Sequence, residues 1–257
     1  MGASALPHAL GAPRIAVNGP GILAALPEEA RSAGGSRMQR GEIAQLADGL
    51  LILAGVGQDS AAAAAQRLYD AGAPGLVSFG TAGGLDPALP TGSLVVPREI
   101  IDDEGRRYAS DGRWRDALMH RLSARIPCHE GALFSARRPA VQVTDKQEAH
   151  ARWGAVAVDM ESAAVARVAE HHRIPFLAIR VVLDGAGHGL PRAALVAFDA
   201  QGRLRLGALV RALAARPQEV AGLHRLSRQF RVSLAVLARV RSLTAPGLAW
   251  MGSEVEA

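Results

Sequence analysis

The hydrophobic positions of the chain form short apolar runs that are separated by longer, alanine-rich amphipathic stretches. Each apolar run has the length of a buried strand, and each amphipathic stretch has the spacing of a helix. The pattern predicts strands at residues 21–26, 50–54, 75–79, 93–97, 155–158 and 175–183. It predicts helices at residues 60–71, ending at the C-cap glycine Gly72, and at residues 162–172. This alternation is typical of a largely parallel sheet that is covered by helices.

We therefore expect a single α/β domain with a twisted, mixed, largely parallel central sheet flanked by helices. Residues 1–20 are expected to form a flexible N-terminal lead-in, residues 21–243 the domain, and residues 244–257 a C-terminal tail. Residues 204–243 have a helical pattern that is interrupted near Pro217 and rich in arginine. Two interpretations of that region stay open. Its apolar face packs on the sheet, or it forms a basic amphipathic surface for anionic lipid or a second subunit.

Composition narrows the possible classes of protein. A chain of 257 residues that is 49% hydrophobic, with a formal net charge of +5, is neither disordered nor long enough for many domains. The single cysteine, Cys128, excludes a disulfide framework and a multi-cysteine metal site. The sequence lacks an apolar run of about 18 residues and a signal-peptide pattern, so we expect a cytoplasmic protein, with membrane association left open. Lys146 is the only lysine, and the arginine bias indicates genome composition rather than nucleic-acid binding.

Polar side chains cluster where the predicted strands end. In an open α/β sheet, ligands bind at such ends. Glu28 and Glu29 follow the first strand, residues 80–84 form a glycine-rich loop after the third, and Asp159, Glu161 and Asp184 follow later strands. Arg180 lies inside an otherwise apolar strand, where a charge is costly unless it meets an anion or a carboxylate.

In this order, these residues resemble the nucleoside phosphorylase and nucleosidase superfamily, of the purine nucleoside phosphorylase and methylthioadenosine/adenosylhomocysteine nucleosidase type. The resemblance spans residues 21–212 and rests on the segments 25–29 (ALPEE), 55–57 (GVG), 80–85 (GTAGGL), 158–162 (VDMES) and 180–184 (RVVLD). A more specific resemblance, to the hopanoid-associated phosphorylases, rests on Asp159 to Ser162, on residues 186–191 (AGHGLP) and on the arginine-rich C-terminal region.

The resemblance implies an enzyme that cleaves the N-glycosidic bond of a purine nucleoside and releases adenine, by phosphorolysis or hydrolysis. The favoured substrate is adenosylhopane, a lipid-linked nucleoside of hopanoid biosynthesis. The alternatives are a soluble methylthioadenosine/adenosylhomocysteine nucleosidase and a non-catalytic nucleoside-binding protein. The resemblance also implies a homo-oligomer without metal or organic cofactor, with phosphate as the candidate co-substrate. We expect no nucleic-acid partner, and peripheral membrane contact stays open.

On the base side of the site, the resemblance implies that Asp184 is the general acid. It would give a proton to N7 of the purine, which lets the base leave. A carboxyl group held partly out of water can keep that proton because burial raises its pKa. Glu161 would bind the ribose hydroxyls and stabilise the cationic sugar. Met160 would pack beneath the ribose, and Val158 and Pro139 would contact the base, with Phe134 or Phe198 as candidates for stacking.

On the nucleophile side, the resemblance points to one pocket with four contributors: Gly57, Gly80, Thr81 and Arg180. Glu28 would act as general base if the nucleophile is water. Ser78 stands where many phosphorylases carry an arginine, which favours hydrolysis, although Arg137 or Arg138 could replace that charge. The simpler alternatives are that Glu28 and Glu29 are first-turn helix acids and that His188, beside Asp184, is a bystander rather than a lid residue.

Overall fold

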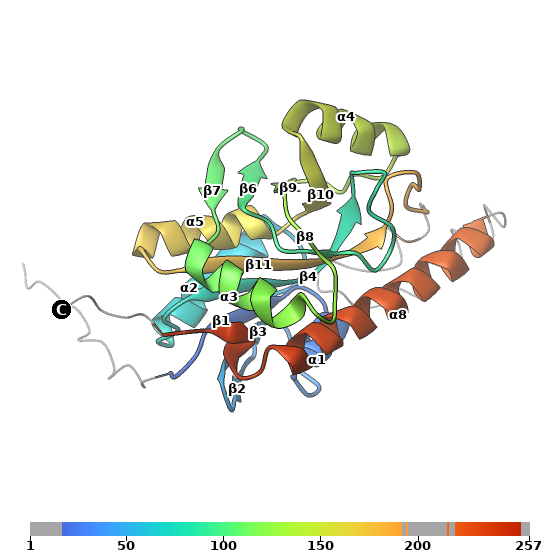
Figure 1. The fold of residues 1–257 in the computed structure, drawn as a ribbon. Helices are drawn as coiled ribbons and strands as arrows, with labels where there is room; N and C mark the ends of the chain where they lie inside the picture. Colours follow the sequence, from blue (N-terminus) through green and yellow to red (C-terminus); the bar gives the residue numbers. More distant parts are fainter. Residues whose placement is uncertain (1–16, 192–193, 195–214, 216–218, 253–257) are drawn as a thin grey trace, which may run out of the picture.

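The computed structural model describes residues 17–191, 194, 215 and 219–252, in which a central mixed sheet is covered by helices on both faces (Figure 1). The strands are β1 (Gly21–Ala24), β2 (Ile43–Leu46), β3 (Gly49–Leu53), β4 (Leu76–Gly84), β5 (Leu94–Val95), β6 (Glu99–Asp102), β7 (Arg107–Ala109), β8 (Cys128–His129), β9 (Ala132–Ser135), β10 (Ala155–Asp159) and β11 (Phe176–Asp184). The helices are α1 (Pro27–Ser32), α2 (Gln58–Asp70), α3 (Gly112–Leu122), α4 (Val143–Trp153), α5 (Ser162–His172), α8 (Glu219–Leu243) and a 3-10 turn, η1 (Gly247–Ala249). The predicted fold class is confirmed.

Strand β4 is the centre of the sheet, because three other strands pair with it. Its first half pairs with β1 in parallel, and β11 runs parallel to almost its whole length. Its last residues, Gly83 and Gly84, pair antiparallel with β10. The full order is β2-β3-β1-β4-β10-β9-β6-β7, with β11 on β4 and β5, and β8 on β5. The ends of β1, β4, β10 and β11 therefore meet around the end of β4.

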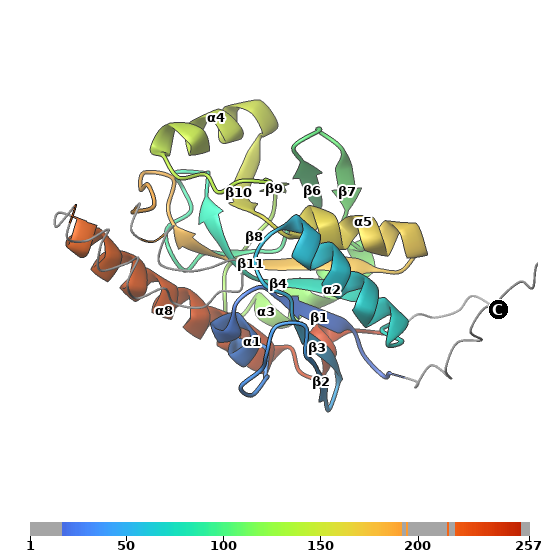
Figure 2. The same ribbon diagram turned by 180° about the vertical axis from the view of Figure 1, so that it is seen from behind.

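Helices cover both faces of this sheet. Helices α2 and α5 pack together on one face, where Figure 2 shows them in front of the sheet. Helices α1, α3 and α8 cover the other face, and their apolar side chains share a core with the inner strands. Helix α4 lies apart from both layers and packs on β9 and β10. Each face of the central strands is thus sealed from water, as the continuous apolar runs predict.

The predicted helix 162–172 matches α5, and the predicted strands at 21–26, 50–54, 155–158 and 175–183 match β1, β3, β10 and β11 within two residues. The glycine-rich segment 80–84 was expected to be a loop, and this was wrong. It continues β4, because Gly80 to Gly83 pair with Arg180 to Asp184 of β11. The prediction omitted β2, β6 to β9, α3 and α4, most of which are short or weakly apolar.

Helix α8 is anchored through its C-terminal half. Ser233, Leu237 and Val240 are its buried residues, and the Oγ of Ser233 donates to the carbonyl of Val182 on β11 at 2.9 Å. The remainder of the predicted helical region, residues 204–218, lies almost wholly outside the described residues. In the part of the chain that the structure describes, no helix has the length and apolar character needed to cross a bilayer.

The segment after α8 returns to the core. The indole Nε1 of Trp114 donates to the carbonyl of Leu248 at 2.8 Å, and the Trp114 and Trp250 rings meet edge to face. Leu248 and Ala249 are buried. Thr244 and residues 247–250, expected as part of a tail, therefore pack with the domain.

We expect Leu237→Ala to lower the free energy of unfolding by about 2–5 kcal/mol, because it removes a fully buried leucine and leaves a cavity between α8 and the sheet. Val232→Ala on the same helix is the matched control. Val232 is 50% exposed, and we expect its loss to change the free energy of unfolding by less than about 0.5 kcal/mol. Urea denaturation of both variants measures the difference. Equal effects would contradict the described packing of α8.

Candidate active site

A pocket opens where β1, β4, β10 and β11 end. Its lining consists of backbone and side chains from these strand ends and from two loops: Ala25, Leu26, Glu29, Val56, Thr81, Ala82, Gly83, Pro139, Ala140, Val158, Asp159, Met160, Glu161, Leu183, Asp184 and Leu190. The structure therefore brings Asp184, Glu161, Met160, Thr81, Val158 and Pro139, all expected in the site, around one hollow.

Glu29, and not Glu28, faces this pocket. The Glu29 side chain is buried, and its Oε1 accepts hydrogen bonds from the backbone N–H of Thr81 at 2.8 Å and from the Thr81 hydroxyl at 2.9 Å. Glu28 is 40% exposed and pairs with Arg31 at 2.8 Å, outside the lining of the pocket. The expectation that Glu28 belongs to the site is therefore corrected, because Glu29 is the carboxyl group of α1 that lines the pocket.

The difference between these neighbours follows from the start of α1. Pro27 is the first helical residue, so Glu29 occupies the third position, from which a carboxylate reaches back to the N-cap backbone. Its Oε2 accepts from the backbone N–H of Leu26 at 3.1 Å. Neighbouring helical residues point about 100° apart, so Glu28 is directed away from the sheet. The proline and the capping spacing were a signal that sequence reasoning could have used to choose Glu29.

Arg180 is buried under the pocket, and its guanidinium belongs to an internal network. Its Nε donates to Oδ2 of Asp159 at 2.8 Å, and its Nη2 donates to the hydroxyls of Ser78 at 2.6 Å and Ser162 at 3.1 Å. Nη1 lies beside Gly80, because a Cβ on that glycine would come within 2.7 Å of Nη1 and 2.8 Å of the Glu29 carboxyl. Because Gly80 has no side chain, Arg180 and Glu29 can both approach the backbone of β4 closely.

Glu161 sits at the N-terminus of α5 and reaches across the site. Its Oε1 accepts from the backbone N–H of Gly57 at 2.8 Å, which explains how a glycine from a distant turn joins the site. The pKa of Glu161 is raised to about 7, first by burial and then by the neighbouring Asp159 carboxylate, while Arg180 opposes the shift. Burial also raises the pKa of Glu29, again against the charge of Arg180.

Asp184 closes β11, and its partner is the only lysine of the chain. The Nζ of Lys146, from α4, lies 2.5 Å from Oδ2 of Asp184, and both side chains are almost fully buried. Burial raises the pKa of Asp184, and the Lys146 charge opposes that rise. Sequence reasoning missed Lys146 because its helix was not predicted.

The candidates for stacking on a base differ in their placement. Phe134 is buried and stacks on Trp153 at 5.7 Å between ring centroids, and it lines a neighbouring hollow rather than this pocket. Phe198 lies outside the described residues. The apolar part of the pocket lining includes Val158, Pro139, Leu183 and Leu190.

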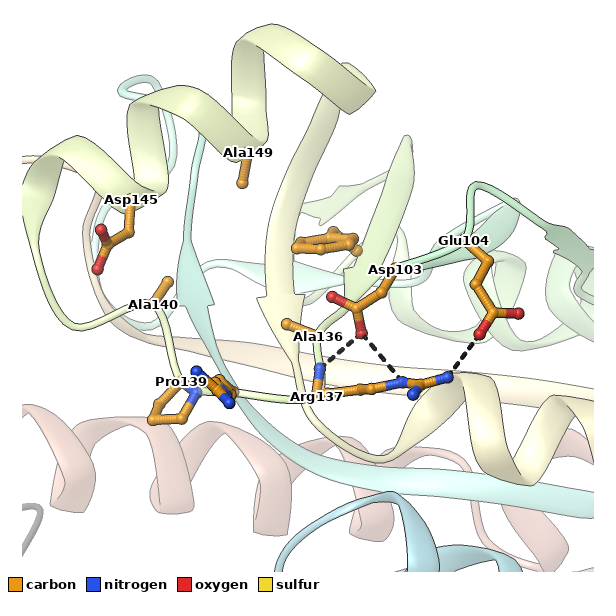
Figure 3. Close-up of a pocket in the computed structure, with 10 residues that line it drawn as sticks. Asp103, Glu104, Ala136, Arg137, Pro139, Ala140, Asp145 and Ala149 are labelled. Atoms are coloured by element: carbon orange, nitrogen blue, oxygen red, sulfur yellow. Dashed lines mark hydrogen bonds and ion pairs between the residues drawn. The ribbon is translucent and has the colours of Figure 1, made fainter.

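The neighbouring hollow has a volume of about 480 Å³ and meets the pocket at Pro139 and Ala140 (Figure 3). Arg137 crosses its floor, where its Nη2 donates to Glu104 at 2.5 Å and its backbone N–H donates to Asp103 at 2.8 Å. Figure 3 shows both bonds on the side of the hollow away from Ala140 and Asp145. The Arg137 guanidinium is therefore paired with acids and does not line the candidate site.

Other polar groups have structural partners. Asp102, the last residue of β6, accepts from the backbone N–H groups of Glu104 and Arg106. His172 bonds to Gln66 and stacks on Tyr69. Burial raises the pKa of the Cys128 thiol to about 11, which disfavours a nucleophilic thiolate. Within the described residues, histidine, cysteine and acidic side chains form no cluster that could hold a metal ion.

We expect Glu161→Gln to raise the melting temperature at pH 8 by a few degrees, roughly 2–4 °C per kcal/mol relieved. The pKa of Glu161 in the folded state is about 7, above its ordinary value of 4.5. Between pH 4.5 and pH 7 the folded state therefore binds a proton at this group that the unfolded state does not. Stability from this group is present at the lower pH and lost as pH rises through 7. The gain in the variant should shrink towards pH 5. Thermal scans at both pH values test this, and a gain independent of pH would contradict it.

Comparison with known proteins agrees with the geometry. The sequence signature of the family described as Phosphorylase superfamily matches residues 16–215 of the chain. The 5'-methylthioadenosine/S-adenosylhomocysteine nucleosidase of Tolumonas auensis is 27% identical over 184 residues, which cover 63% of this chain and 79% of that protein.

Two solved structures share the fold. The 5'-methylthioadenosine/S-adenosylhomocysteine nucleosidase of Helicobacter pylori superposes with a TM-score of 0.66 at 17% identity, covering 90% of this chain and 99% of that one. The futalosine hydrolase of the same organism has a TM-score of 0.66 at 16% identity, covering 88% of this chain and 97% of that one. Because the family signature matches most of its length, the chain belongs to the phosphorylase superfamily.

Proposed function

We propose that this protein hydrolyses a 5'-substituted adenosine, releasing adenine and the free sugar. Family membership and the nucleosidase relatives support an enzyme that cleaves the N-glycosidic bond of a purine nucleoside. The proposal adds three points: water as the nucleophile, adenine as the base that leaves, and the nature of the 5' substituent. A cytoplasmic homo-oligomer without metal or organic cofactor stays part of it as a prediction.

The charge of the pocket is the observation that favours hydrolysis over phosphorolysis. Its described lining includes the carboxyl groups of Glu29, Asp159, Glu161 and Asp184 and no lysine, arginine or histidine. A phosphate dianion in that setting would meet carboxyl groups and would find no cation among the described lining side chains to pair with. Ser78 accepts from Arg180, which is itself committed to Asp159. Water is the nucleophile that this electrostatic environment tolerates.

On the nucleophile side, Glu29 is the general base. Thr81 and the N-cap of α1 hold its carboxylate in one orientation, with the Thr81 hydroxyl at the edge of the pocket. A water beside Glu29 would attack C1' of the sugar as its proton passes to the Glu29 carboxylate. Glu161 faces the same space and would accept hydrogen bonds from the ribose hydroxyls while its charge favours the cationic sugar.

On the base side, Asp184 is the general acid. The C1'–N9 bond breaks with its electron pair going to the purine, and the Asp184 carboxyl gives its proton to N7. The water oxygen completes the sugar at C1', so nucleoside and water become sugar and adenine. Asp184 has then lost one proton and Glu29 has gained one, and exchange with solvent restores both. Burial raises the pKa of Asp184, which favours the protonated form that a general acid needs.

The relatives guide the choice of 5' substituent. The named Tolumonas and Helicobacter proteins are 5'-methylthioadenosine/S-adenosylhomocysteine nucleosidases, which supports a thioether nucleoside as the substrate class. The lipid-linked nucleoside adenosylhopane is the second candidate. What supports it is the surface of α8, which exposes Val220 and Val232 on a helix whose only acidic residue is Glu219.

We expect Glu29→Gln to lower kcat for adenine release by about 10²–10⁴-fold, because the attacking water loses its general base. The matched control is Glu28→Gln, which removes an exposed ion pair one residue earlier and should change kcat by less than about twofold. Release of adenine from methylthioadenosine, with and without phosphate, is the assay. Free sugar formed at the same rate in both buffers supports hydrolysis.

Two results would count against the proposal. Dependence on phosphate with formation of a sugar 1-phosphate would make the protein a phosphorylase. A larger loss in Glu28→Gln than in Glu29→Gln would show that the described orientation of α1 is not the functional one. Absence of adenine from every nucleoside tried, the lipid-linked one included, would favour a binding protein.

The lipid-linked candidate makes its own prediction. If adenosylhopane is the substrate, its kcat/KM should exceed that of methylthioadenosine, and the protein should sediment with phosphatidylglycerol vesicles at low salt, because arginines on α8 would attract an anionic surface. Phosphatidylcholine vesicles are the control. A protein that stays in the supernatant with both and prefers the thioether would remove this candidate.

A further inference from the structure

The Lys146–Asp184 pair is the feature that the mechanism leaves unexplained. Lys146 is the only lysine in a chain with 29 basic residues, and its side chain is 1% exposed. A buried ammonium is costly unless each of its protons is bonded. Here it has three acceptors: Oδ2 of Asp184 at 2.5 Å, the carbonyl of Asp184 at 3.2 Å and the carbonyl of Gly185 at 3.0 Å.

We propose that Lys146 is the positioning residue of the general acid: it holds Asp184 with Oδ1 towards the base and stabilises the carboxylate that remains once the proton has gone to N7. This rests on the proposed function and deepens it.

The two carboxyl oxygens of Asp184 have different surroundings. Lys146 occupies Oδ2, so Oδ1 is the oxygen left to carry the transferable proton. Oδ1 lies near Gly83, which lines the pocket, because a Cβ on that glycine would come 3.6 Å from Oδ1 and 3.7 Å from Cε of Lys146. The two carbonyl bonds tie the ammonium to the backbone at the end of β11. The carboxyl group is thereby fixed in rotation as well as in place.

The charge has a separate consequence. When Asp184 gives up its proton, a negative charge appears 2.5 Å from the ammonium, and their attraction is strong because both side chains are almost fully buried. Lys146 therefore makes Asp184 a stronger acid than burial alone would allow. The other charged groups that face Asp184 are His188 from the following loop and, across the pocket, Glu29, Asp159 and Glu161. Lys146 is the cation in direct contact among the described residues.

The test is the pH dependence of kcat for adenine release in Lys146→Met. Activity needs protonated Asp184, so it falls as pH rises through the pKa of that group. Loss of the opposite charge raises this pKa, and we expect the alkaline limb to move up by about 1–2 pH units. We also expect kcat below the limb to fall about 10–100-fold, because a weaker and less fixed acid protonates N7.

Two variants separate this from general damage. Lys146→Arg keeps a cation, and its alkaline limb should stay near that of the wild type. Glu148→Gln, an exposed position on the same helix, should leave both the limb and kcat unchanged. A limb in Lys146→Met at the wild-type pH, or a kcat within twofold of the wild type, overturns the proposal.

A second comparison covers the case in which Lys146→Met does not fold. Asp184→Asn is compared with the double variant Asp184→Asn/Lys146→Met, in which both charges of the pair are absent. If Lys146 acts through Asp184, the two retain equal residual activity, and a further loss in the double variant overturns the proposal. Failure of the proposed function is distinct, because the wild type itself would then release no adenine, or would release it only when phosphate is present.

Discussion

The contact between Arg180 and the acids around it is the interaction on which the rest of the site depends. Arg180 stands opposite Gly80 in the β11–β4 register, so the central strand pair itself places the guanidinium beneath the pocket. Its bonds to Asp159, Ser78 and Ser162 connect β11 to β10, β4 and the start of α5. Removing one partner of such a buried pair costs about 3–5 kcal/mol. The strand register brings Arg180 to its partners, and the cost of losing them in turn stabilises that register.

The acids of the site differ in what surrounds them, and this difference allows separate roles. Glu29 accepts three hydrogen bonds and faces Arg180, Glu161 lies next to another carboxylate, and Asp184 has an ammonium of its own. Pairs of titratable groups in unlike environments take opposite parts in acid–base chemistry. One pocket can therefore hold both a general base and a general acid, as the proposed function requires.

Much of this arrangement could be predicted from the sequence. Motifs at strand ends, read in chain order, located Glu161, Asp184, Thr81 and Met160, because strand ends of a parallel sheet converge. The choice between Glu28 and Glu29 depends on helix rotation, and it was missed although Pro27 marks the first turn. Lys146 could not be found this way. Its contact with Asp184 spans 38 residues and depends on how α4 docks, which no local pattern encodes.

The charged groups of the pocket come from places scattered along most of the chain, from Glu29 in α1 through Lys146 in α4 to Asp184 at the end of β11. Contacts of such high sequence separation form late, after the loops between them have closed. Until β11 joins β4, Arg180 and the acids have water as their partner, and a partly assembled sheet that excluded water would strand them unpaired. We therefore expect the pocket to be completed only when β11 has joined β4, and a shortened chain that ends before β11 would keep Glu29, Asp159 and Glu161 but lack Arg180 and Asp184.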